Sequence, residues 1–442
     1  MNVGDVRSKE HMGIVTSDTS TGKLSFFVTP LKNKAGIVEG DFVVVDHPAF
    51  GELCPLLAVV KEINNYEEVV GTTLVEKSVQ TVAVAEILGF VDLRDESWRL
   101  SRLIVPPSPG SKVFMPCFEF LENVFLRDMD GMRFEHALHL GSLATNAVSR
   151  NGQCKPLDFY LDARDFRRQH FLIAGMTGTG KTHTATIVVE ELANKANLPV
   201  VVLDGFSEYT SVCFGSKHFE ELTRTGTVPA KDYPFKFGVS VLAFDPGAVK
   251  RRLEKQGISV KKDDRLSIRQ LSGKWREFPD EKALRAVREE LSDAVKPGQV
   301  LVLDGNGMGL EERRKLFSCC VSALWSCRVD ESVEPFVLVI DNAEAVEREL
   351  LERVASEGRK FGVSMCLATQ HLSGISGKVL SQIGSFIMGR MTDNEDLDRL
   401  KTAAREKSAL LPNLRTGEWI VNWVAVGRPV KVSVRDRYSL ST

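Results

Sequence analysis

Residues 171–182 read Phe171-Leu172-Ile173-Ala174-Gly175-Met176-Thr177-Gly178-Thr179-Gly180-Lys181-Thr182, and this stretch decides the fold. The apolar run at its start predicts a short buried strand, and the Ala-, Val- and Glu-rich residues 183–192 predict a helix. Between them the pattern G-x-x-x-x-G-K-[ST] is complete. Such a loop turns its backbone N–H groups inward, and the helix N-terminus adds partial positive charge. The sequence therefore predicts a phosphate-binding loop formed by Gly175, Thr177, Gly178, Thr179, Gly180, Lys181, Thr182 and His183.

The two residues that end this pattern have chemical roles of their own. We expect Lys181 to reach the β- and γ-phosphates of a bound nucleotide, and the hydroxyl of Thr182 to ligate Mg²⁺. ATP and Mg²⁺ are therefore the predicted cofactors.

A magnesium ion at this loop also needs a carboxylate at the end of a neighbouring buried strand. The apolar residues 336–340 predict that strand, and Asp341 follows it, so Thr182 and Asp341 are the predicted metal ligands. The next residue is Asn342, at the position where a glutamate would polarise the attacking water. Glu344 is the nearest carboxylate, and it either takes over this role or opens a helix as a surface residue.

Other predicted strands also end in polar residues. The strand at residues 200–203 is followed by Asp204 and then Glu208, and either is an alternative water-activating base. The strand at residues 363–369 is followed by Gln370, which either senses the γ-phosphate by hydrogen bonding or is an ordinary strand-terminal amide. These residues are candidates because the carboxyl ends of parallel strands are where α/β sheets bind ligands.

Apolar runs alternate with helical stretches from residue 170 onward. This pattern indicates an α/β domain with a central, mostly parallel sheet over residues 157–442, within which the polar residues 212–298 predict a helical insert. Residues 11–90 instead read as closely spaced short strands, which predicts a small N-terminal β-barrel over residues 1–105. Residues 106–156 begin with a Pro- and Gly-rich loop and are predicted to be a connector.

The composition is ordinary for a globular protein. Of 442 residues, 43% are hydrophobic and 26% are charged, which excludes a disordered chain, a collagen-like repeat and a disulfide scaffold. No apolar run reaches the roughly 18–20 residues that span a bilayer, and the N-terminal residues lack a secretory signal pattern. We therefore expect a cytoplasmic protein that does not enter the membrane.

The formal net charge of −2 is unevenly divided. Residues 1–150 carry 14 Lys or Arg against 20 Asp or Glu, whereas residues 151–442 carry 43 against 39. Neither part resembles a strongly basic nucleic-acid-binding domain. Binding to nucleic acid would therefore need a local patch or an assembled channel.

The order and spacing of the later motifs resemble the HerA branch of the HerA–FtsK superfamily of ring-forming ATPases. The resemblance covers nearly the whole chain, because the N-terminal strands match the small barrel that such proteins place before the motor. Asn342 departs from the usual Asp-Glu pair of the family. The segments that carry the resemblance are residues 175–182, 204–209, the Asp341 strand, Glu357-Gly358-Arg359-Lys360-Phe361-Gly362, Ala368-Thr369-Gln370, residues 380–382, 392–396 and 411–418.

This resemblance implies a RecA-like P-loop ATPase core that assembles into a homo-hexameric ring, with ATP at the subunit interfaces. It also implies an arginine from the neighbouring subunit that stabilises charge on the transferring phosphoryl group. Arg359 is the first candidate, and Arg353 and Arg168 are alternatives.

The family threads double-stranded DNA through the ring and commonly works with a NurA-type nuclease in DNA end processing, whereas some bacterial relatives pair with other effectors. Phosphate contact needs Lys and Arg side chains that line the channel. The candidates in the insert are Lys250, Arg251, Arg252, Lys261 and Lys262.

Two functions remain open at this point. The chain is either an ATP-driven duplex-DNA translocase or helicase that acts with a nuclease in DNA repair, or a nucleotide-binding ring scaffold that hydrolyses ATP slowly or not at all. Asn342 and the acidic N-terminal region favour the scaffold, since an acidic face can dock a basic partner such as a nuclease or an antiviral effector.

Overall fold

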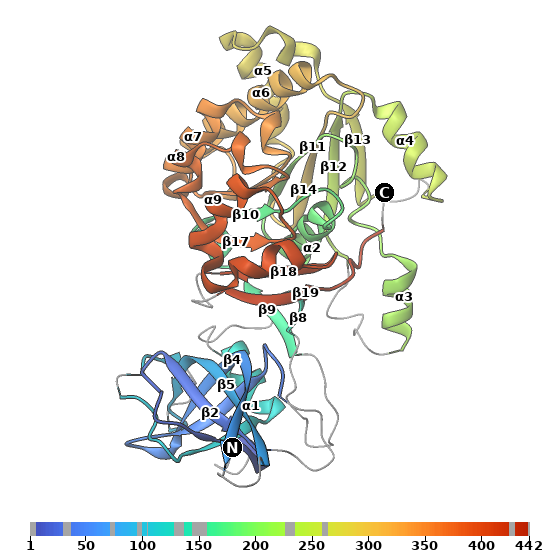
Figure 1. The fold of residues 1–442 in the computed structure, drawn as a ribbon. Helices are drawn as coiled ribbons and strands as arrows, with labels where there is room; N and C mark the ends of the chain where they lie inside the picture. Colours follow the sequence, from blue (N-terminus) through green and yellow to red (C-terminus); the bar gives the residue numbers. More distant parts are fainter. Residues whose placement is uncertain are drawn as a thin grey trace. The chain divides into compact units, whose positions relative to one another are not determined.

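The structure is a computed structural model, and it describes residues 6–29, 37–70, 76–94, 100–103, 105–127, 137–143, 157–225, 235–258, 264–423 and 429–440. The chain divides into two compact units, which Figure 1 draws in colours that follow the sequence. The barrel unit consists of residues 1–132 and 142–159, and the α/β unit consists of residues 133–141 and 160–442. Within the described residues, no helix combines the length and the apolarity that crossing a bilayer requires.

The barrel unit contains a closed ring of antiparallel strands. Its hydrogen-bonded order is β2-β1-β7-β3-β4-β5, a pairing of β2 with β5 closes the ring, and β6 pairs with β5. Alternate side chains point inward, such as Leu24 and Phe26 or Val43 and Val45, and form the core. The elements are β1 (Arg7–Val15), β2 (Lys23–Val28), β3 (Phe42–His47), β4 (Gly51–Val70), β5 (Glu76–Val91), β6 (Leu100–Ser101), β7 (Lys112–Pro116) and α1 (Phe118–Arg127).

The barrel extends past the boundary that the sequence predicts at residue 105. Strand β7 follows the Pro-rich loop, yet it pairs with both β1 and β3 and so completes the ring. The predicted connector, residues 106–156, therefore contributes β7 and α1 to the barrel unit and contains strand β8 (Ala137–Leu143). A strand of five residues has too little periodicity to be told from a loop by sequence alone.

The α/β unit is built on a twelve-stranded sheet with the order β13-β12-β14-β11-β15-β16-β10-β17-β18-β19-β8-β9. Neighbouring strands run parallel from β13 to β17, and β18 then pairs antiparallel with both β17 and β19. Every residue of β10, β11 and β16 is buried, as expected for parallel strands covered on both faces. The strands other than β8 are β9 (Leu157–Asp162), β10 (His170–Ala174), β11 (Val200–Asp204), β12 (Gly238–Ala243), β13 (Leu266–Gln270), β14 (Gln299–Asp304), β15 (Phe336–Asp341), β16 (Val363–Thr369), β17 (Ile383–Met388), β18 (Glu418–Asn422) and β19 (Pro429–Val434).

Helices cover both faces of this sheet. Alternate strand residues such as Leu203 and Ile340 pack in one core with Leu316 and Phe317 of α6. Helix α2 contacts β10, β11, β14, β15 and β16 from the other face, as right-handed crossovers require, and Figure 1 shows it lying against the strands. The helices are α2 (Lys181–Asn194), α3 (Lys217–Arg224), α4 (Pro246–Lys255), α5 (Glu281–Ser292), α6 (Leu310–Val329), α7 (Arg348–Glu357), α8 (Gly377–Leu380) and α9 (Asn394–Ala404).

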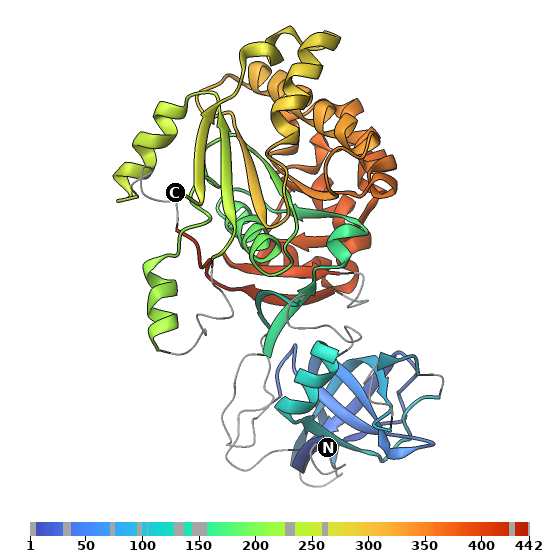
Figure 2. The ribbon, with the colours of Figure 1, turned by 180° about the vertical axis from the view of Figure 1, so that it is seen from behind.

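The predicted helical insert, residues 212–298, contributes α3, α4 and α5 but also two strands of the sheet. β12 and β13 pair in parallel with each other, and β12 also pairs with β14. Seen from behind in Figure 2, these yellow-green strands form one edge of the sheet, with α4 beside them. Both strands are short and lie between polar segments, so the surrounding composition hides them from sequence analysis.

The strand order gathers the predicted site residues at one edge of the sheet. β10, β11, β15 and β16 end at Ala174, Asp204, Asp341 and Thr369, so these carboxyl ends lie along the same edge. Strand β16 separates β10 from β15, so Asp341 follows the second strand from the phosphate-binding loop and not the adjacent one. Helix α2 starts at the end of β10 and contacts both β15 and β16, which brings its first turn to Asp341.

Candidate nucleotide-binding site

The phosphate-binding loop has the backbone that its glycines predict. Gly178 and Gly180 adopt positive φ angles of 79° and 95°, which glycine reaches without the steric cost of a Cβ. Gly180 is the N-cap of α2, and the backbone N–H of Thr179 donates to the carbonyl of Met176 over 3.3 Å. A Cβ at Gly178 would meet no other atom within 4 Å, so there is open space beside the loop. The loop and the helix N-terminus therefore form a cradle suited to phosphate.

Lys181, Thr182 and Asp341 come together at the start of α2. The Thr182 hydroxyl donates to Oδ2 of Asp341 over 2.9 Å, although the two residues are far apart in sequence. The Lys181 ammonium donates to the carbonyl of Met176 at 3.2 Å, so its side chain folds back over the loop. Burial lowers the pKa of Lys181, and the charges of Asp341 and Glu208 oppose this shift.

Tyr209 is a further member of this group, and the sequence alone predicts no role for it. It is fully buried, and its hydroxyl donates to the same Oδ2 of Asp341 over 3.0 Å. Burial raises the pKa of Asp341, and the hydrogen bonds from Thr182 and Tyr209 oppose this rise. Tyr209 therefore helps to keep the Asp341 carboxylate charged and oriented. Its position directly after Glu208 in a strand-end segment is the one signal that pointed to it.

Asp204 holds the loop that carries Glu208. Its Oδ1 accepts the backbone N–H of Phe206 at 3.0 Å, and its Oδ2 accepts that of Tyr209 at 2.9 Å. Asp304 lies beside it in the register of β11 and β14, and both side chains are buried. Burial, and after it the charge of Asp304, raises the pKa of Asp204 to about 7. With one backbone N–H bound to each of its two oxygens, Asp204 holds the shape of this loop.

Glu208 is the carboxylate that this loop brings to the phosphate-binding helix. Burial raises its pKa, the charge of Asp341 adds to the rise, and a contact with Thr182 opposes it. Glu208 therefore lies beside Thr182 and Asp341, the predicted magnesium ligands.

Asn342 and Glu344 follow Asp341 at the end of β15. Asn342 has φ 85°, and its backbone N–H donates to the carbonyl of Ala368 at 3.0 Å. Asparagine tolerates positive φ better than glutamate does, so the local backbone accounts for the residue type. The exposed Glu344 lies on a short 3₁₀ turn, Ala343–Ala345, and its side chain packs next to Gly374. The structure does not bring it to Thr182.

Gln370 joins the site from the end of β16. The Thr177 hydroxyl donates to its Oε1 over 2.6 Å, so the amide contacts the phosphate-binding loop directly. His183, the last predicted residue of the loop, instead directs its Nε2 to the carbonyl oxygen of Arg435 at 3.0 Å.

The three candidate arginines lie apart from this group. Arg359 is exposed on the 3₁₀ turn Gly358–Phe361, and its Nη2 donates to Oε1 of Gln382 at 3.3 Å. Arg353 on α7 lies over the Trp325 ring and 3.8 Å from Glu357, and Arg168 is exposed just before β10. Within one chain none of them is a contact of the Thr182–Asp341 pair.

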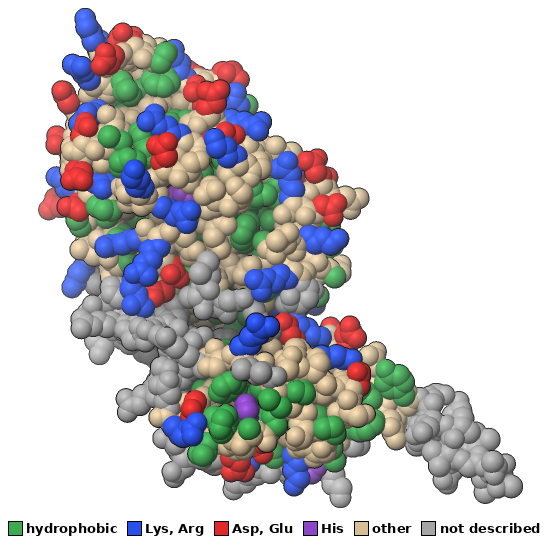
Figure 3. All heavy atoms as spheres, turned by 90° about the vertical axis from the view of Figure 1, so that its left-hand side faces the viewer, with side chains coloured by type: hydrophobic (Ala, Val, Ile, Leu, Met, Phe, Trp, Pro, Cys, Tyr) green, Lys and Arg blue, Asp and Glu red, His purple; other side chains and the backbone are tan. Residues whose placement is uncertain are grey.

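The basic candidates of the insert lie on α4. Lys250 and Arg251 are exposed, whereas Arg252 donates from Nη1 to the carbonyl of Phe206 at 2.6 Å, in the loop that carries Glu208. Lys261 and Lys262 lie outside the described residues. On the face of the α/β unit shown in Figure 3, the described Lys and Arg side chains are interspersed with Asp and Glu and do not form one large basic patch.

The residues present fit a magnesium–nucleotide complex. The open glycine loop offers backbone donors for phosphate, and Thr182 and Asp341 supply the hard oxygen ligands that Mg²⁺ prefers. Among the described residues, no group of three or more His, Cys, Asp or Glu side chains forms a larger metal site. A site with few protein oxygens is what Mg²⁺ uses when phosphates complete its coordination. The RecA-like fold and this site define the chain as a P-loop nucleoside-triphosphate-binding protein.

Comparison with known proteins narrows this class. The family model described as the central domain of helicase HerA matches residues 138–246. A probable helicase of Methanocaldococcus jannaschii is 22% identical and aligns over 97% of this chain and 91% of its own length. The DNA double-strand break repair helicase HerA of Pyrococcus furiosus is also 22% identical, over 96% of this chain and 91% of its own. The predicted resemblance to the HerA family is therefore confirmed.

Solved structures give weaker likenesses. VirB4 of Thermoanaerobacter pseudethanolicus aligns with 69% of this chain and 98% of its own, at 12% identity and a TM-score of 0.40. The genome packaging NTPase B204 of Sulfolobus turreted icosahedral virus 2 aligns with 60% of this chain and 97% of its own, at 13% identity and a TM-score of 0.34.

Proposed function

We propose that the chain is an ATPase that uses the energy of hydrolysis to move duplex DNA. The observation that carries the ATPase part is the meeting of Lys181, Thr182 and Asp341 at the start of α2. Lys181 would contact the β- and γ-phosphates, Thr182 and Asp341 would hold Mg²⁺, and bound Mg²⁺ would neutralise charge on the phosphates. Gln370, already bonded to Thr177 of the loop, would sense the γ-phosphate.

Among the candidate bases, we propose Glu208. Its contact with Thr182 places it beside the predicted metal ligands, and its raised pKa makes it a stronger proton acceptor than an exposed glutamate. Asp204 is engaged by two backbone N–H groups, and Glu344 packs beside Gly374. In this assignment the presence of Asn342 in place of a glutamate does not by itself prevent hydrolysis.

The motor part of the proposal rests on the HerA-type relatives described above, which are named as helicases and align along most of this chain. We propose that the chain acts in the cytoplasm as a homo-hexameric ring around double-stranded DNA, with a NurA-like nuclease or another effector as partner. Arg359 would then act in the neighbouring subunit's site, since it is exposed and lies apart from the Thr182–Asp341 pair of its own chain.

The second candidate function is a ring scaffold with slow or no hydrolysis. Asn342 favours it, because the family's usual glutamate is absent from that position. The two functions differ in a simple measurement, the rate of ATP hydrolysis with and without duplex DNA. The motor predicts turnover that DNA stimulates and that Lys181→Ala abolishes. A wild-type ring that binds ATP but turns it over at the Lys181→Ala rate, with or without DNA, would establish the scaffold.

The trans role of Arg359 has its own test, in which inactive variants are mixed. Lys181→Ala and Arg359→Ala subunits each lack one half of a site, so either alone is expected to be inactive. In mixed rings, some interfaces combine an intact Lys181 with an intact Arg359 of the neighbour, and activity should return. If Arg359 acts only in its own chain, mixing restores nothing. Arg353→Ala mixed with Lys181→Ala is the matched comparison.

A further inference from the structure

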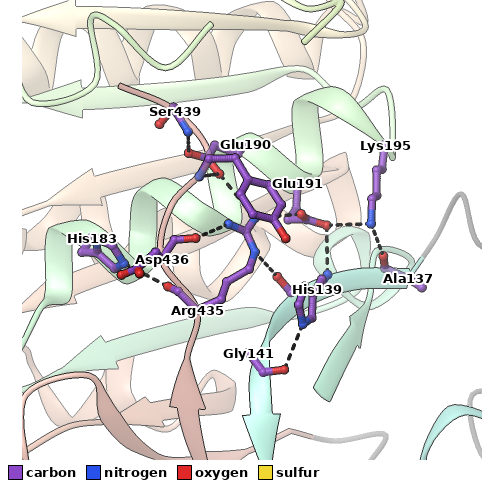
Figure 4. Close-up of polar contacts among 11 residues, drawn as sticks. Ala137, His139, Gly141, His183, Glu190, Glu191, Lys195, Arg435, Asp436 and Ser439 are labelled. Carbon is purple, nitrogen blue, oxygen red and sulfur yellow. Dashed lines mark hydrogen bonds and ion pairs between the residues drawn. The ribbon is translucent and has the colours of Figure 1, made fainter. Parts of the chain in front are cut away.

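The far half of helix α2 contains two adjacent glutamates that are almost completely buried. Glu190 is 0% exposed and Glu191 is 1% exposed. Taking carboxylates out of water is costly unless each is paired and hydrogen-bonded. Figure 4 shows that the partners come from three segments, namely α2 itself, strand β8 and the C-terminal residues after β19.

Arg435 is the central partner of both glutamates. Its Nη2 lies 3.3 Å from Oε2 of Glu190 and 2.8 Å from Oε1 of Glu191. Lys195, the C-cap residue of α2, lies 3.3 Å from Glu191. The backbone N–H groups of Tyr438 and Ser439 donate to Glu190 at 3.2 and 2.7 Å, and that of His139 donates to Glu191 at 2.9 Å.

Arg435 also binds the backbone of strand β8. Its Nε donates to the carbonyl of His139 at 3.0 Å, and its backbone N–H donates to that of Leu140 at 3.1 Å. Gly141 permits the approach, because a Cβ there would lie 2.1 Å from the carbonyl oxygen of Ser433. One side chain therefore joins the helix of the phosphate-binding loop to β8 and to the C-terminal segment.

Arg435 contacts α2 at two levels. Its guanidinium binds Glu190 and Glu191, and its carbonyl oxygen lies 3.0 Å from Nε2 of His183, the residue that follows Thr182. Positions 183, 190 and 191 are seven and eight residues apart, so they lie on one face of the helix. Contacts at both ends of a two-turn stretch fix how α2 is rotated about its axis. Because Thr182 is in the first turn, this rotation also sets its 2.9 Å contact with Asp341.

We propose that Arg435 is a positioning residue of the nucleotide site, which sets the rotation of α2 and thereby the geometry of the Thr182–Asp341 pair toward Mg²⁺. The inference rests on the nucleotide binding of the proposed function and goes beyond it, since it assigns a role to a residue remote from the phosphates. A misplacement of about 1 Å in the geometry of a reaction site can cost on the order of 100-fold in rate. Mg²⁺ is sensitive to such displacement because it demands nearly ideal octahedral geometry.

The test measures how much Mg²⁺ tightens nucleotide binding. Affinity for a fluorescent ATP analogue is measured in Mg²⁺ and in EDTA for the wild type, Arg435→Met, Arg435→Lys and the control Lys431→Met. Lys431 is a matched control, because it is a cation of the preceding strand whose ion pair with Glu418 is partly exposed. We expect Arg435→Met to lose most of the Mg²⁺-dependent gain while its affinity in EDTA stays close to that of the wild type. Arg435→Lys keeps the charge but loses the planar fork, so it should retain part of the gain. Lys431→Met should match the wild type.

Two results would overturn the proposal. One is that Mg²⁺ tightens nucleotide binding by Arg435→Met as much as it does for the wild type. The other is that Arg435→Met loses affinity equally with and without Mg²⁺, which is what a general structural role would produce. If Arg435→Met does not fold, Glu191→Gln decides the question, because it keeps an oxygen acceptor but removes one charge. A partial loss of the Mg²⁺ gain in Glu191→Gln supports the role of Arg435, and an unchanged gain refutes it. A wild type that shows the gain but hydrolyses no ATP would contradict the proposed ATPase and leave this binding test valid.

Discussion

Tyr209 donates its hydroxyl proton to Oδ2 of Asp341 across 3.0 Å, and it does so from a loop whose start is held by Asp204. The hydrogen bond joins the ends of β11 and β15, two strands that are adjacent in the sheet. It leaves Asp341 with two hydroxyl donors on one oxygen, since Thr182 binds the same atom. The loop that carries Glu208 is thus tied directly to the predicted metal ligand.

Replacing Tyr209 by Phe should lower kcat for ATP hydrolysis by roughly tenfold, because a hydrogen bond to a charged group contributes about 1.5–3 kcal/mol and part of it is lost. The measurement is steady-state hydrolysis at saturating Mg²⁺ and ATP. Tyr66→Phe, at an exposed position of the barrel unit, is the control and should leave kcat unchanged. A Tyr209→Phe enzyme with wild-type kcat would show that Asp341 does not need this donor.

The stability of variants at position 342 should follow the backbone strain that a positive φ angle imposes on each residue type. At φ 85°, Asn342→Ala and Asn342→Glu should each cost about 1–2 kcal/mol of stability, whereas Asn342→Gly should be close to neutral. Urea denaturation of the three variants checks the order. The exposed Asn394, at the start of α9, is the control, and its change to Ala should shift stability by less than about 0.5 kcal/mol. Equal stability of the Gly and Glu variants would contradict the strain argument.

The Asp204–Asp304 pair should make stability depend on pH. The pKa of Asp204 is raised to about 7 from its ordinary 3.8, so the folded state holds a proton that the unfolded chain releases. Its contribution to stability is fully present below pH 3.8 and is lost as pH rises toward 7, by up to roughly 1.4 kcal/mol per unit. Asp304 is also faced by the cations Arg252 and Arg313, which lower its pKa against the effect of burial.

The check is urea unfolding from pH 5 to 8 in the wild type and in Asp304→Asn. The amide keeps an acceptor for the backbone N–H of Asn306 but removes the neighbouring charge, so the variant should lose less stability over this range. The difference between the two slopes isolates the pair from all other titrating groups. Parallel slopes would mean that the charge of Asp304 does not raise the pKa of Asp204.

Gly141→Ala should strongly destabilise the α/β unit. The new Cβ would lie 2.1 Å from the carbonyl oxygen of Ser433, so β8 and β19 must move apart, at a cost of roughly 1–3 kcal/mol or more. Thermal unfolding measures the loss. Gly377→Ala in α8 has no atom within 4 Å of the added group and should be neutral or stabilising. A Gly141→Ala protein as stable as the wild type would show that β8 is not held close to β19.

Much of the fold is predictable because its central strands are fully buried. Apolar runs such as residues 200–203 and 336–340 predict parallel strands, and the residues at their ends are polar, as sites at strand ends require. The short strands β7 and β12 were not predicted, because they are only five and six residues long, lie next to Pro-rich or polar segments, and pair with strands that are distant in sequence.

The site is predictable where a motif has a fixed spacing. The glycine loop identifies Lys181 and Thr182, and the strand-end rule identifies Asp341, which the structure places in contact with Thr182. The contribution of Arg435 leaves no local trace. Its partners His183, Glu190 and Glu191 are on a helix formed near the middle of the chain, and only the completed sheet brings them together.

The place of β10 in the sheet has a consequence for how the chain is made. Ala174 pairs with Thr369 on one side and with Met388 on the other, so neither neighbour of this strand exists until most of the polypeptide has been synthesised. Such non-local pairing is slow to form, so apolar strands remain unpaired and exposed in the meantime. We therefore expect β10 to be among the last strands to dock during translation, and its apolar side chains to stay exposed on the nascent chain until residue 388 has emerged from the ribosome.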